Sequence, residues 1–373
     1  MIDPREFLAC LREAGVDFLA GVPDSLLQEF CAAAEENLPP DRHIITANEG
    51  NAVALVSGFH LATGKIGAVY LQNSGLGNAV NPLTSLADAE VYRIPMLLII
   101  GWRGEPGVKD EPQHIKQGRI TPQLLEVLEI PSWNLDAESN TRMLVTNAIQ
   151  KARQTGTPVA FLVRKNTFAK YTRTTRALTQ GTSLRRETAL RCLVDLAGDA
   201  LIVSTTGKTS RELHELRQER HEPQRDFLTV GSMGHTASIA LGLALGRPDK
   251  RVVCLDGDGS LLMHMGALPI IGSLKPARLL HVLLNNAAHE SVGGQATVAD
   301  RMDFRAIALA SGYTAYEQAN SVEEISRAWN VLTAQPGPLM LEIKLATGAR
   351  ENLGRPTRSP EENKKAFMEW VAR

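Results

Sequence analysis

Short apolar runs alternate with longer stretches of helical character along the chain, and this plan occurs twice. A strand that is buried on both faces of a parallel sheet is apolar almost throughout, so each short run predicts such a strand. The first half of the chain has five expected strands, Asp17–Val22, Ile44–Ala47, Gly67–Leu71, Met96–Ile100 and Val159–Val163. The second half also has five, Leu201–Ser204, Phe227–Val230, Val252–Leu255, Leu280–Leu284 and Leu339–Ile343.

Helices are expected between these strands, for example over Ser25–Glu36, Asn51–Thr63 and Thr141–Thr155. Between the two halves, Lys170–Arg176 is polar, basic and without periodicity, which is typical of an exposed linker. The pattern therefore predicts an α/β protein with two doubly wound, mainly parallel-sheet domains. We place them at residues 1–168 and 187–373, with a linker over 169–186.

Composition narrows the class of protein without naming its chemistry. The chain has 373 residues, 43% of them hydrophobic and 22% charged, as in ordinary globular proteins. A formal net charge of −1 gives no support for binding nucleic acid or a membrane surface, so neither partner is expected. The N-terminus lacks a signal-peptide pattern and no apolar run is long enough to span a membrane, which favours a cytoplasmic enzyme. The four cysteines lack metal-site spacing, and we expect buried thiols.

Two polar motifs stand at the ends of expected strands in the second half. Gly257-Asp258-Gly259-Ser260 follows one apolar run, and Asn285-Asn286 follows the next, about two dozen residues later. Ligands bind at the carboxyl ends of strands in open parallel sheets, so these side chains can meet at one site. Carboxylate and amide oxygens suit Mg²⁺, and the glycines allow phosphates to approach the backbone. The alternative is a common tight turn with a solvated Asp258.

A third motif lies in the first half, where Glu49 follows the strand that ends near Ala47 and opens a helix of small residues. Burial at this position would raise the pKa of the carboxyl group and favour its protonated form. The alternative is an acid that only stabilises the helix N-terminus.

Together these motifs resemble the thiamine diphosphate-dependent enzymes over nearly the whole chain. The resemblance implies a pyrimidine-binding domain over 1–168 and a diphosphate- and magnesium-binding domain over 187–373. The chain departs from the longer members of pyruvate decarboxylase type, because there is no room for a central third domain between residues 168 and 187. The resemblance also implies the cofactors thiamine diphosphate and Mg²⁺, and a homo-oligomer whose sites lie between chains. In such enzymes Glu49 would contact the cofactor's pyrimidine ring.

The same resemblance assigns the other cofactor contacts. Asp258 and Asn286 would bind Mg²⁺ through their side chains and Ala288 through its carbonyl. In the loop that begins at Gly257, the amides of Gly259 and Ser260 would hold the diphosphate. Met233 would wedge under the cofactor, and the Gly231 carbonyl would accept a hydrogen bond from its amino group. The family often has Gly at position 287, where this chain has Ala; a positive φ there would cost about 1 kcal/mol.

Further runs resemble the phosphonopyruvate and sulfopyruvate decarboxylases within this superfamily. They are Gly21–Ser25, Leu71–Asn78 and Gly101–Glu105, while Val108–His114, Thr205–Leu213, Gly231–His235 and His289–Gln295 resemble the phosphonopyruvate branch. The implied substrate is a small phosphonate 2-oxo acid, which is decarboxylated to an aldehyde. A sulfopyruvate decarboxylase and a non-catalytic cofactor-binding subunit are the alternatives.

A substrate with two anionic groups needs cationic and polar donors. Several cluster in a segment after the strand Met96–Ile100 that we expect to be rich in loops, namely Arg103, Lys109, His114, Lys116 and Arg119. We expect Arg103, Lys109 and His114 to contact substrate, together with Ser25 and His289. Asp24 and His114 are candidates for catalytic proton transfer beside Glu49.

Overall fold

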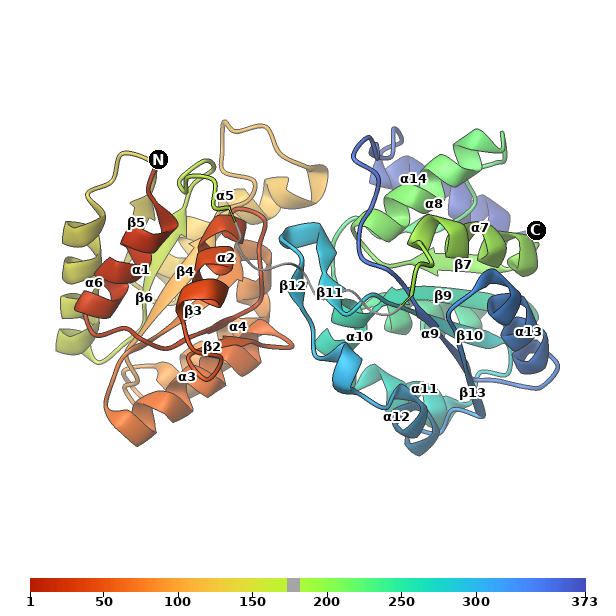
Figure 1. The fold of residues 1–373 in the computed structure, drawn as a ribbon, viewed down its shortest axis with the longest axis horizontal. Helices are drawn as coiled ribbons and strands as arrows, with labels where there is room; N and C mark the ends of the chain where they lie inside the picture. The colour runs from red at the N-terminus through yellow and green to blue at the C-terminus, as the bar shows by residue number, and fades with distance from the viewer. Residues whose placement is uncertain (173–181) are drawn as a thin grey trace. The chain divides into compact units, whose positions relative to one another are not determined.

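The computed structural model describes residues 1–172 and 182–373, and the chain divides into two compact units. The first comprises Met1–Ala177 with Val292–Gln295, and the second comprises Leu178–Ser291 with Ala296–Arg373. The expected linker, 169–186, lies partly outside the described residues. Each unit contains a six-stranded parallel sheet with helices around it (Figure 1).

The first sheet has the strand order β2-β1-β3-β4-β6-β5. Because β1 has β2 on one side and β3 on the other, the order reverses at β1, which is where doubly wound sheets bind ligands. The strands are β1 (Leu19–Gly21), β2 (His43–Ile45), β3 (Gly67–Gln72), β4 (Met96–Gly101), β5 (Ser132–Leu135) and β6 (Val159–Val163). The helices are α1 (Pro4–Glu13), α2 (Gln28–Asn37), α3 (Glu49–Thr63), α4 (Leu76–Pro82), α5 (Pro112–Val127) and α6 (Thr141–Thr155), with short helices η1 (Asn73–Gly75) and η2 (Leu83–Ala87).

Successive residues of these strands point to opposite faces of the sheet and enter two separate cores. Tyr70 packs in the core beneath α1, α2 and α6, whereas its neighbours Val69 and Leu71 pack in the core beneath α3 and α4. Figure 1 shows α1 beside α6 and α3 beside α4 around this sheet. Burial on both faces explains why β3, β4 and β6 are apolar almost throughout.

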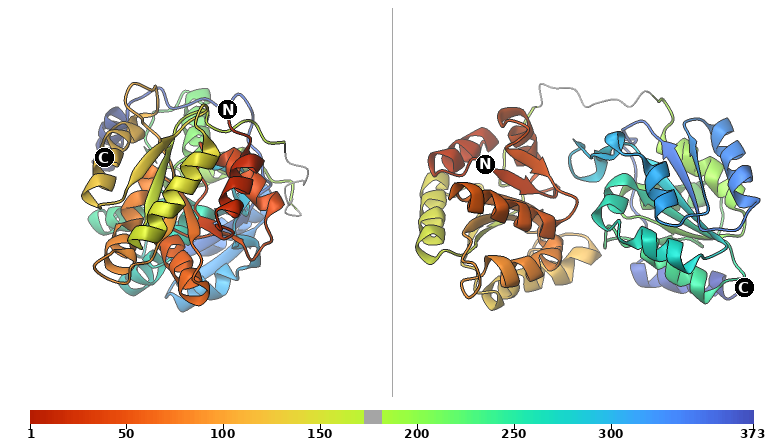
Figure 2. Two further views of the ribbon diagram at one scale, coloured as in Figure 1. Left: turned by 90° about the vertical axis from the view of Figure 1, so that its left-hand side faces the viewer. Right: turned by 90° about the horizontal axis from the view of Figure 1, so that it is seen from below.

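The second sheet has the order β13-β14-β10-β9-β7-β8, which reverses at β7. Its helices again cover both faces and its strands lie between them (Figure 2). The strands are β7 (Leu201–Ser204), β8 (Phe227–Leu228), β9 (Val252–Gly257), β10 (Leu279–Asn285), β13 (Ala315–Ala319) and β14 (Leu339–Lys344). The helices are α7 (Arg186–Ala197), α8 (Lys208–Glu219), α9 (Thr236–Gly246), α10 (Asp258–Met263), α11 (Ala267–Leu274), α12 (Phe304–Ala310), α13 (Val322–Thr333) and α14 (Pro360–Val371). Short elements β11 (Ala288–His289), η3 (Glu290–Val292), β12 (Gln295–Ala296) and η4 (Ala299–Arg301) follow β10.

The expected α/β class with two parallel sheets is confirmed, but each sheet has one strand more than expected. The additional strands, β5 and β13, lie at sheet edges. All their residues except the last of each strand are partly buried or exposed, and their sequences, SWNL and AYEQA, are correspondingly mixed. An apolar-run criterion finds strands buried on both faces and misses such edge strands.

The segment after β4 also differs from expectation. We expected loops around Arg103, Lys109, His114, Lys116 and Arg119, but the last three lie in helix α5. The helix begins with Pro112, which the first turn tolerates, and it contains a second proline, Pro122. These prolines and Gly118 obscure the helical pattern in the sequence.

The cysteines behave as expected, because Cys10, Cys31 and Cys254 are buried, Cys192 is partly buried, and none of the four forms a disulfide within the described residues. Within the described residues, no helix is both long and apolar enough to cross a membrane.

Candidate active site

The carboxyl edge of the first sheet carries the polar residues expected in this unit. Asp24 and Ser25 follow β1, Glu49 follows β2, Asn73 follows β3 and Arg103 follows β4. All these strands are parallel, so the polar residues that follow them lie on one edge of the sheet. The sequence motifs of this half therefore meet at one place.

Glu49 is the first residue of α3 and is only 4% exposed. Asn48 caps the helix by accepting a hydrogen bond from the Asn51 amide at 3.0 Å. Burial raises the pKa of the Glu49 carboxyl group, although Asn78 Nδ2 donates to its Oε2 at 2.8 Å. The strand before Glu49 is a half-buried edge strand, not the buried strand that we expected. The burial of Glu49 comes instead from η1 and α4, where Gly75 and Asn78 lie.

Asp24 is fully buried, and its carboxylate is only partly satisfied. Oδ2 accepts a hydrogen bond from the Leu26 amide at 2.8 Å, while Oδ1 has no partner. Burial raises the pKa of Asp24 to about 6, against the opposing effects of backbone amides and of Arg103. Gly101 makes room for this carboxylate, since a Cβ there would fall 2.1 Å from Oδ2. Asp24 can therefore exchange a proton near neutral pH.

Arg103 is held by Asp110 in a bidentate ion pair. Its Nη1 also donates to Ser25 Oγ at 2.6 Å. The Asp110 carboxylate accepts two further hydrogen bonds, from the Gly104 and Glu111 amides, each at 2.8 Å. The guanidinium is therefore fixed in place and its charge is partly compensated, while two of its five N–H groups remain for another ligand.

His114 lies in the first turn of α5 and is 8% exposed. Burial, with a contribution from Arg103, lowers its pKa to about 4, so the imidazole is neutral at pH 7. Its Nδ1 is buried and has no hydrogen-bond partner. Lys109, by contrast, is exposed, as are Lys116 and Arg119.

Buried Asn73 joins the ends of β3 and β4 to α5. Its Nδ2 donates to the Arg103 carbonyl at 2.8 Å and to Thr121 Oγ1 at 3.0 Å, and its Oδ1 accepts from the Arg103 amide. Asn73 thus fixes the backbone that carries Arg103.

In the second unit, Asp258 is the first residue of α10, directly after β9, and is 2% exposed. Thr297 Oγ1 donates to its Oδ2 at 2.5 Å. Burial raises the pKa of Asp258 to about 6, although hydrogen bonds from Thr297 and from the amides of Gly259 and Asn286 oppose the shift. A bound cation would stabilise the negative charge of this buried carboxylate.

The two asparagines that end β10 have different surroundings. Asn285 is fully buried and donates from Nδ2 to Glu342 Oε1 at 2.7 Å. Asn286 accepts from the Ala288 amide at Oδ1, 3.2 Å away, and donates from Nδ2 to Glu290 Oε2 at 3.2 Å. The residue after them, Ala287, has a φ of 53° and so adopts the positive φ that we considered from the sequence.

The remaining residues expected to bind the cofactor lie on neighbouring loops of the second unit. Ser260 is buried and accepts from the Gly234 amide at 3.1 Å, which links α10 to the loop that carries Gly231 and Met233. Gly231 and Met233 are both partly exposed. Gly257 ends β9, and a Cβ on Gly259 would fall 3.0 Å from the His289 ring. Burial lowers the pKa of His289 to about 4.

Cys254, Asp256 and His281 form a buried polar group on the strands that precede Asp258 and Asn286. They lie on β9 and β10, with His281 Nε2 3.4 Å from Asp256 Oδ2 and His281 Nδ1 3.0 Å from the Tyr313 hydroxyl. Asp256 Oδ1 accepts from the Gly257 amide at 3.0 Å. The group therefore supports the backbone just before Asp258.

Sequence reasoning did not find Asn78, Asp110, Thr297 or Glu290, which hold the predicted side chains in place. Asn78, Asp110 and Glu290 do lie within the runs Leu71–Asn78, Val108–His114 and His289–Gln295. Thr297 gives no signal of its own, because its partner Asp258 is distant in sequence.

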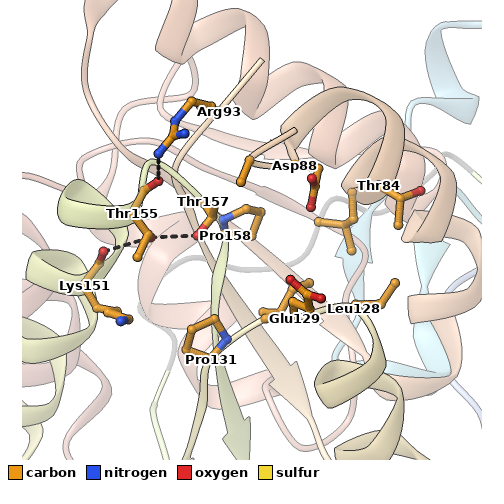
Figure 3. A pocket seen from close by; sticks show the side chains of 13 residues that line it. Thr84, Asp88, Arg93, Leu128, Glu129, Pro131, Lys151, Thr155, Thr157 and Pro158 are labelled. Atoms are coloured by element: carbon orange, nitrogen blue, oxygen red, sulfur yellow. Dashed lines mark hydrogen bonds between the residues drawn. The ribbon is translucent and has the colours of Figure 1, made fainter. Parts of the chain in front are cut away.

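A pocket of about 390 Å³ in the first unit contains none of the predicted residues. Figure 3 shows Arg93 pointing to the Thr155 carbonyl, with which it forms a 2.9 Å hydrogen bond. The lining residues include Arg93, Pro131 and Pro158, which precede β4, β5 and β6. The pocket therefore lies at the amino edge of the sheet, away from Glu49 and Asp24.

Comparison with protein families identifies the type of domain that carries the residues around Glu49 and the type that carries the residues around Asp258. Residues 5–124 match the N-terminal TPP binding domain of thiamine pyrophosphate enzymes, and residues 205–343 match the C-terminal TPP binding domain. The chain belongs to the thiamine pyrophosphate enzymes. The matches cover the motifs around Glu49 and Asp258, so this thiamine pyrophosphate enzyme carries both kinds of cofactor-binding domain in one chain.

Three relatives are similar over the whole chain. Phosphonopyruvate decarboxylase of Streptomyces viridochromogenes is 36% identical, and that of Streptomyces hygroscopicus is 35% identical. Sulfopyruvate decarboxylase of Methanosarcina acetivorans is 30% identical. Each match covers 100% of this chain, and 95%, 94% and 98% of the respective relatives.

The residues present fit thiamine diphosphate and a divalent cation. Asp258, Asn286 and the Ala288 carbonyl offer the hard oxygen donors that Mg²⁺ prefers. Gly257 and Gly259 flank Asp258 and have no side chain that would keep a phosphate away from the start of α10. In the first unit, the buried Glu49 offers a carboxyl group whose raised pKa suits a hydrogen bond to a ring nitrogen.

Proposed function

We propose that this enzyme decarboxylates phosphonopyruvate to phosphonoacetaldehyde and CO₂, using thiamine diphosphate and Mg²⁺. The substrate assignment rests on the full-length similarity to two phosphonopyruvate decarboxylases, at 36% and 35% identity. The sulfopyruvate decarboxylase of similar length is 30% identical. Thiamine diphosphate, when bound, supplies the nucleophilic carbon and takes up the electron pair that CO₂ leaves behind.

Glu49 acts on the pyrimidine ring of the cofactor. Its burial and raised pKa support a role in which the carboxyl group shares a proton with the ring nitrogen and so makes the ring's amino group basic. Asn78 holds one carboxylate oxygen and thereby orients the other.

Asp258, Asn286 and the Ala288 carbonyl bind Mg²⁺, and the amides of Gly259 and Ser260, which follow Gly257 at the start of α10, hold the diphosphate. An ion held there would neutralise and position the diphosphate. Met233 would pack against the bound cofactor, and the Gly231 carbonyl would accept a hydrogen bond from its amino group.

Asp24 handles protons at the reacting carbon, and His114 is a hydrogen-bonding partner beside it. The pKa of about 6 at Asp24 lets the carboxyl group carry a proton near neutral pH. His114 has a pKa of about 4, so it remains neutral and acts as a hydrogen-bonding partner, not as a cation.

Arg103 and Ser25 bind the substrate's anionic groups. Asp110 compensates part of the charge of Arg103, so this residue contributes directed N–H groups more than net positive charge. Exposed Lys109 supplies the free charge that the phosphonate needs, and His289 contacts the substrate from the Asp258 side.

Two alternatives make different predictions about substrate and activity. A sulfopyruvate decarboxylase would prefer a sulfonate, which carries one charge less than a phosphonate dianion. A non-catalytic subunit would bind the cofactor without turnover. The full-length matches to decarboxylases and the burial of both Glu49 and Asp258 favour a catalyst.

We also propose a cytoplasmic homo-oligomer in which each cofactor contacts Glu49 of one chain and Asp258 of another. The family resemblance supports this arrangement. Mixing an inactive Glu49→Gln chain with an inactive Asp258→Ala chain tests it, because hybrid oligomers should regain activity. No regain, with hybrids demonstrated by native mass spectrometry, would contradict shared sites.

The proposed substrate is tested by comparing kcat/KM for phosphonopyruvate, sulfopyruvate and pyruvate with the same preparation. We expect phosphonopyruvate to exceed sulfopyruvate by at least about tenfold, which corresponds to about 1.4 kcal/mol of transition-state binding. A preference for sulfopyruvate would replace the assignment, and the absence of turnover with all three would support the non-catalytic alternative.

A further inference from the structure

We propose that Glu290 is a positioning residue for the magnesium site, because its carboxylate decides which end of the Asn286 amide faces the ion. The inference rests on the proposed function only for the identity of Asn286 as a metal ligand. Glu290 itself lies four residues further along, in η3, and is not expected to touch the metal.

The contact between the two residues is direct. Asn286 Nδ2 donates to Glu290 Oε2 at 3.2 Å. A carboxylate can only accept hydrogen bonds, whereas an amide has one accepting end and one donating end. The amide nitrogen of Asn286 must therefore face Glu290, and its oxygen is left for a cation. The Ala288 amide, which donates to this oxygen at 3.2 Å, favours the same orientation.

Glu290 is itself held firmly. Arg186 Nη1 donates to its Oε2 at 2.6 Å, and the Gly348 amide donates to its Oε1 at 2.6 Å. Lys208 Nζ lies 3.6 Å from Oε1. Both oxygens are thus engaged by groups from three separate segments of the second unit.

The charges around Glu290 are balanced. Arg186 is 7% exposed and makes a bidentate ion pair with Glu212, at 2.7 and 2.8 Å. With Lys208, the group has two positive and two negative charges, so Glu290 can remain a carboxylate at this partly buried position. Outer partners of this kind typically change metal affinity by about 10- to 100-fold.

The test measures Mg²⁺ affinity, without substrate, from the tryptophan fluorescence change on thiamine diphosphate binding and from titration calorimetry. Glu290→Gln should raise the apparent Kd for Mg²⁺ by about 10- to 100-fold. In an Asn286→Asp protein, Glu290→Gln should instead lower the apparent Kd for Mg²⁺. Two adjacent carboxylates would repel each other there, and Glu290→Gln would supply an amide donor to the new carboxylate and so tighten Mg²⁺ binding.

Glu212→Gln is the matched control, since it removes one negative charge from the same network without touching Asn286. It should change the Kd for Mg²⁺ by less than about threefold. If Glu290→Gln does not fold, Glu290→Asp keeps the charge beside Arg186 but shortens the reach to Asn286, and it should weaken Mg²⁺ binding by about tenfold.

Three results would overturn the inference. They are an unchanged Kd in Glu290→Gln, an equal loss in Glu212→Gln, or the same fold-change for Glu290→Gln in both the Asn286 and Asn286→Asp backgrounds. Because no substrate is present, a wrong substrate assignment leaves these outcomes untouched. An Asp258→Ala protein with wild-type Mg²⁺ affinity would instead show that the metal site itself is wrongly placed.

Discussion

Glu49 and Gly75 are fitted to each other so closely that a Cβ on residue 75 would fall 2.0 Å from Glu49 Oε1. Gly75 has a φ of −79°, which any residue can adopt. The requirement for glycine is therefore one of space beside the carboxylate, not of backbone conformation.

Gly75→Ala should displace Glu49 and lower kcat by about a hundredfold, because small displacements of a catalytic group have effects of that order. Gly77→Ala, in the same segment, is the control, since a Cβ on Gly77 would meet nothing within 4 Å. The control should keep activity and gain up to about 1 kcal/mol of stability from its helical position. Steady-state kinetics and urea unfolding measure both. Equal activity in the two variants would show that Glu49 does not depend on this contact.

The pKa of Asp24 predicts a pH dependence of stability. Its folded pKa is about 6, against an ordinary value of 3.8, so between these values the folded protein holds a proton that the unfolded chain has released. The free energy of unfolding should therefore fall as pH rises through this interval and stay lower above it. Asp24→Asn removes this contribution, on the order of 1–3 kcal/mol, and should flatten the dependence. Urea unfolding between about pH 4 and pH 7 tests it; parallel curves for both proteins would contradict the raised pKa.

Ala287 has a φ of 53°, which glycine adopts without strain. Ala287→Gly should therefore raise the free energy of unfolding by about 0.5–1 kcal/mol, measured by urea unfolding. The neighbouring Ala288→Gly, in a short strand, should lower it by a similar amount. A loss of stability in both variants would show that the turn does not store this strain.

Arg103→Ala should lower kcat/KM for phosphonopyruvate by about ten- to a hundredfold, as expected for the loss of a charge-assisted contact. Any slow turnover of pyruvate, which lacks the phosphonate, should change little. Arg119→Ala, an exposed cation on α5, is the control and should leave both substrates unaffected. An equal loss for both substrates would mean that Arg103 supports the fold or the cofactor, and that Lys109 or another cation binds the head group.

The sequence predicts the fold wherever burial dominates. The central strands of both sheets are apolar because both faces are covered, and they are found at nearly their observed limits. Edge strands β5 and β13 are half exposed, so their mixed sequences carry no such signal. Helix α5 is missed because Pro112, Gly118 and Pro122 are read as signs of a loop.

The site can be predicted in part for a similar reason. Asp24, Glu49 and Arg103 follow strands of the first sheet, and Asp258 follows a strand of the second. In each sheet the strands are parallel, so residues that follow them lie at one edge. Their supporting partners are fixed by tertiary contacts instead. Thr297 donates a hydrogen bond to Asp258, which lies 39 positions away in the sequence, and no local sequence pattern predicts such a pair.

The most direct test of the central claim is product identification with phosphonopyruvate by phosphorus NMR and CO₂ release. With thiamine diphosphate and Mg²⁺, the wild-type enzyme should convert phosphonopyruvate to phosphonoacetaldehyde with one equivalent of CO₂, and Glu49→Gln should be slower by about a hundredfold or more. Unchanged phosphonopyruvate under conditions in which the same preparation decarboxylates sulfopyruvate would contradict the account.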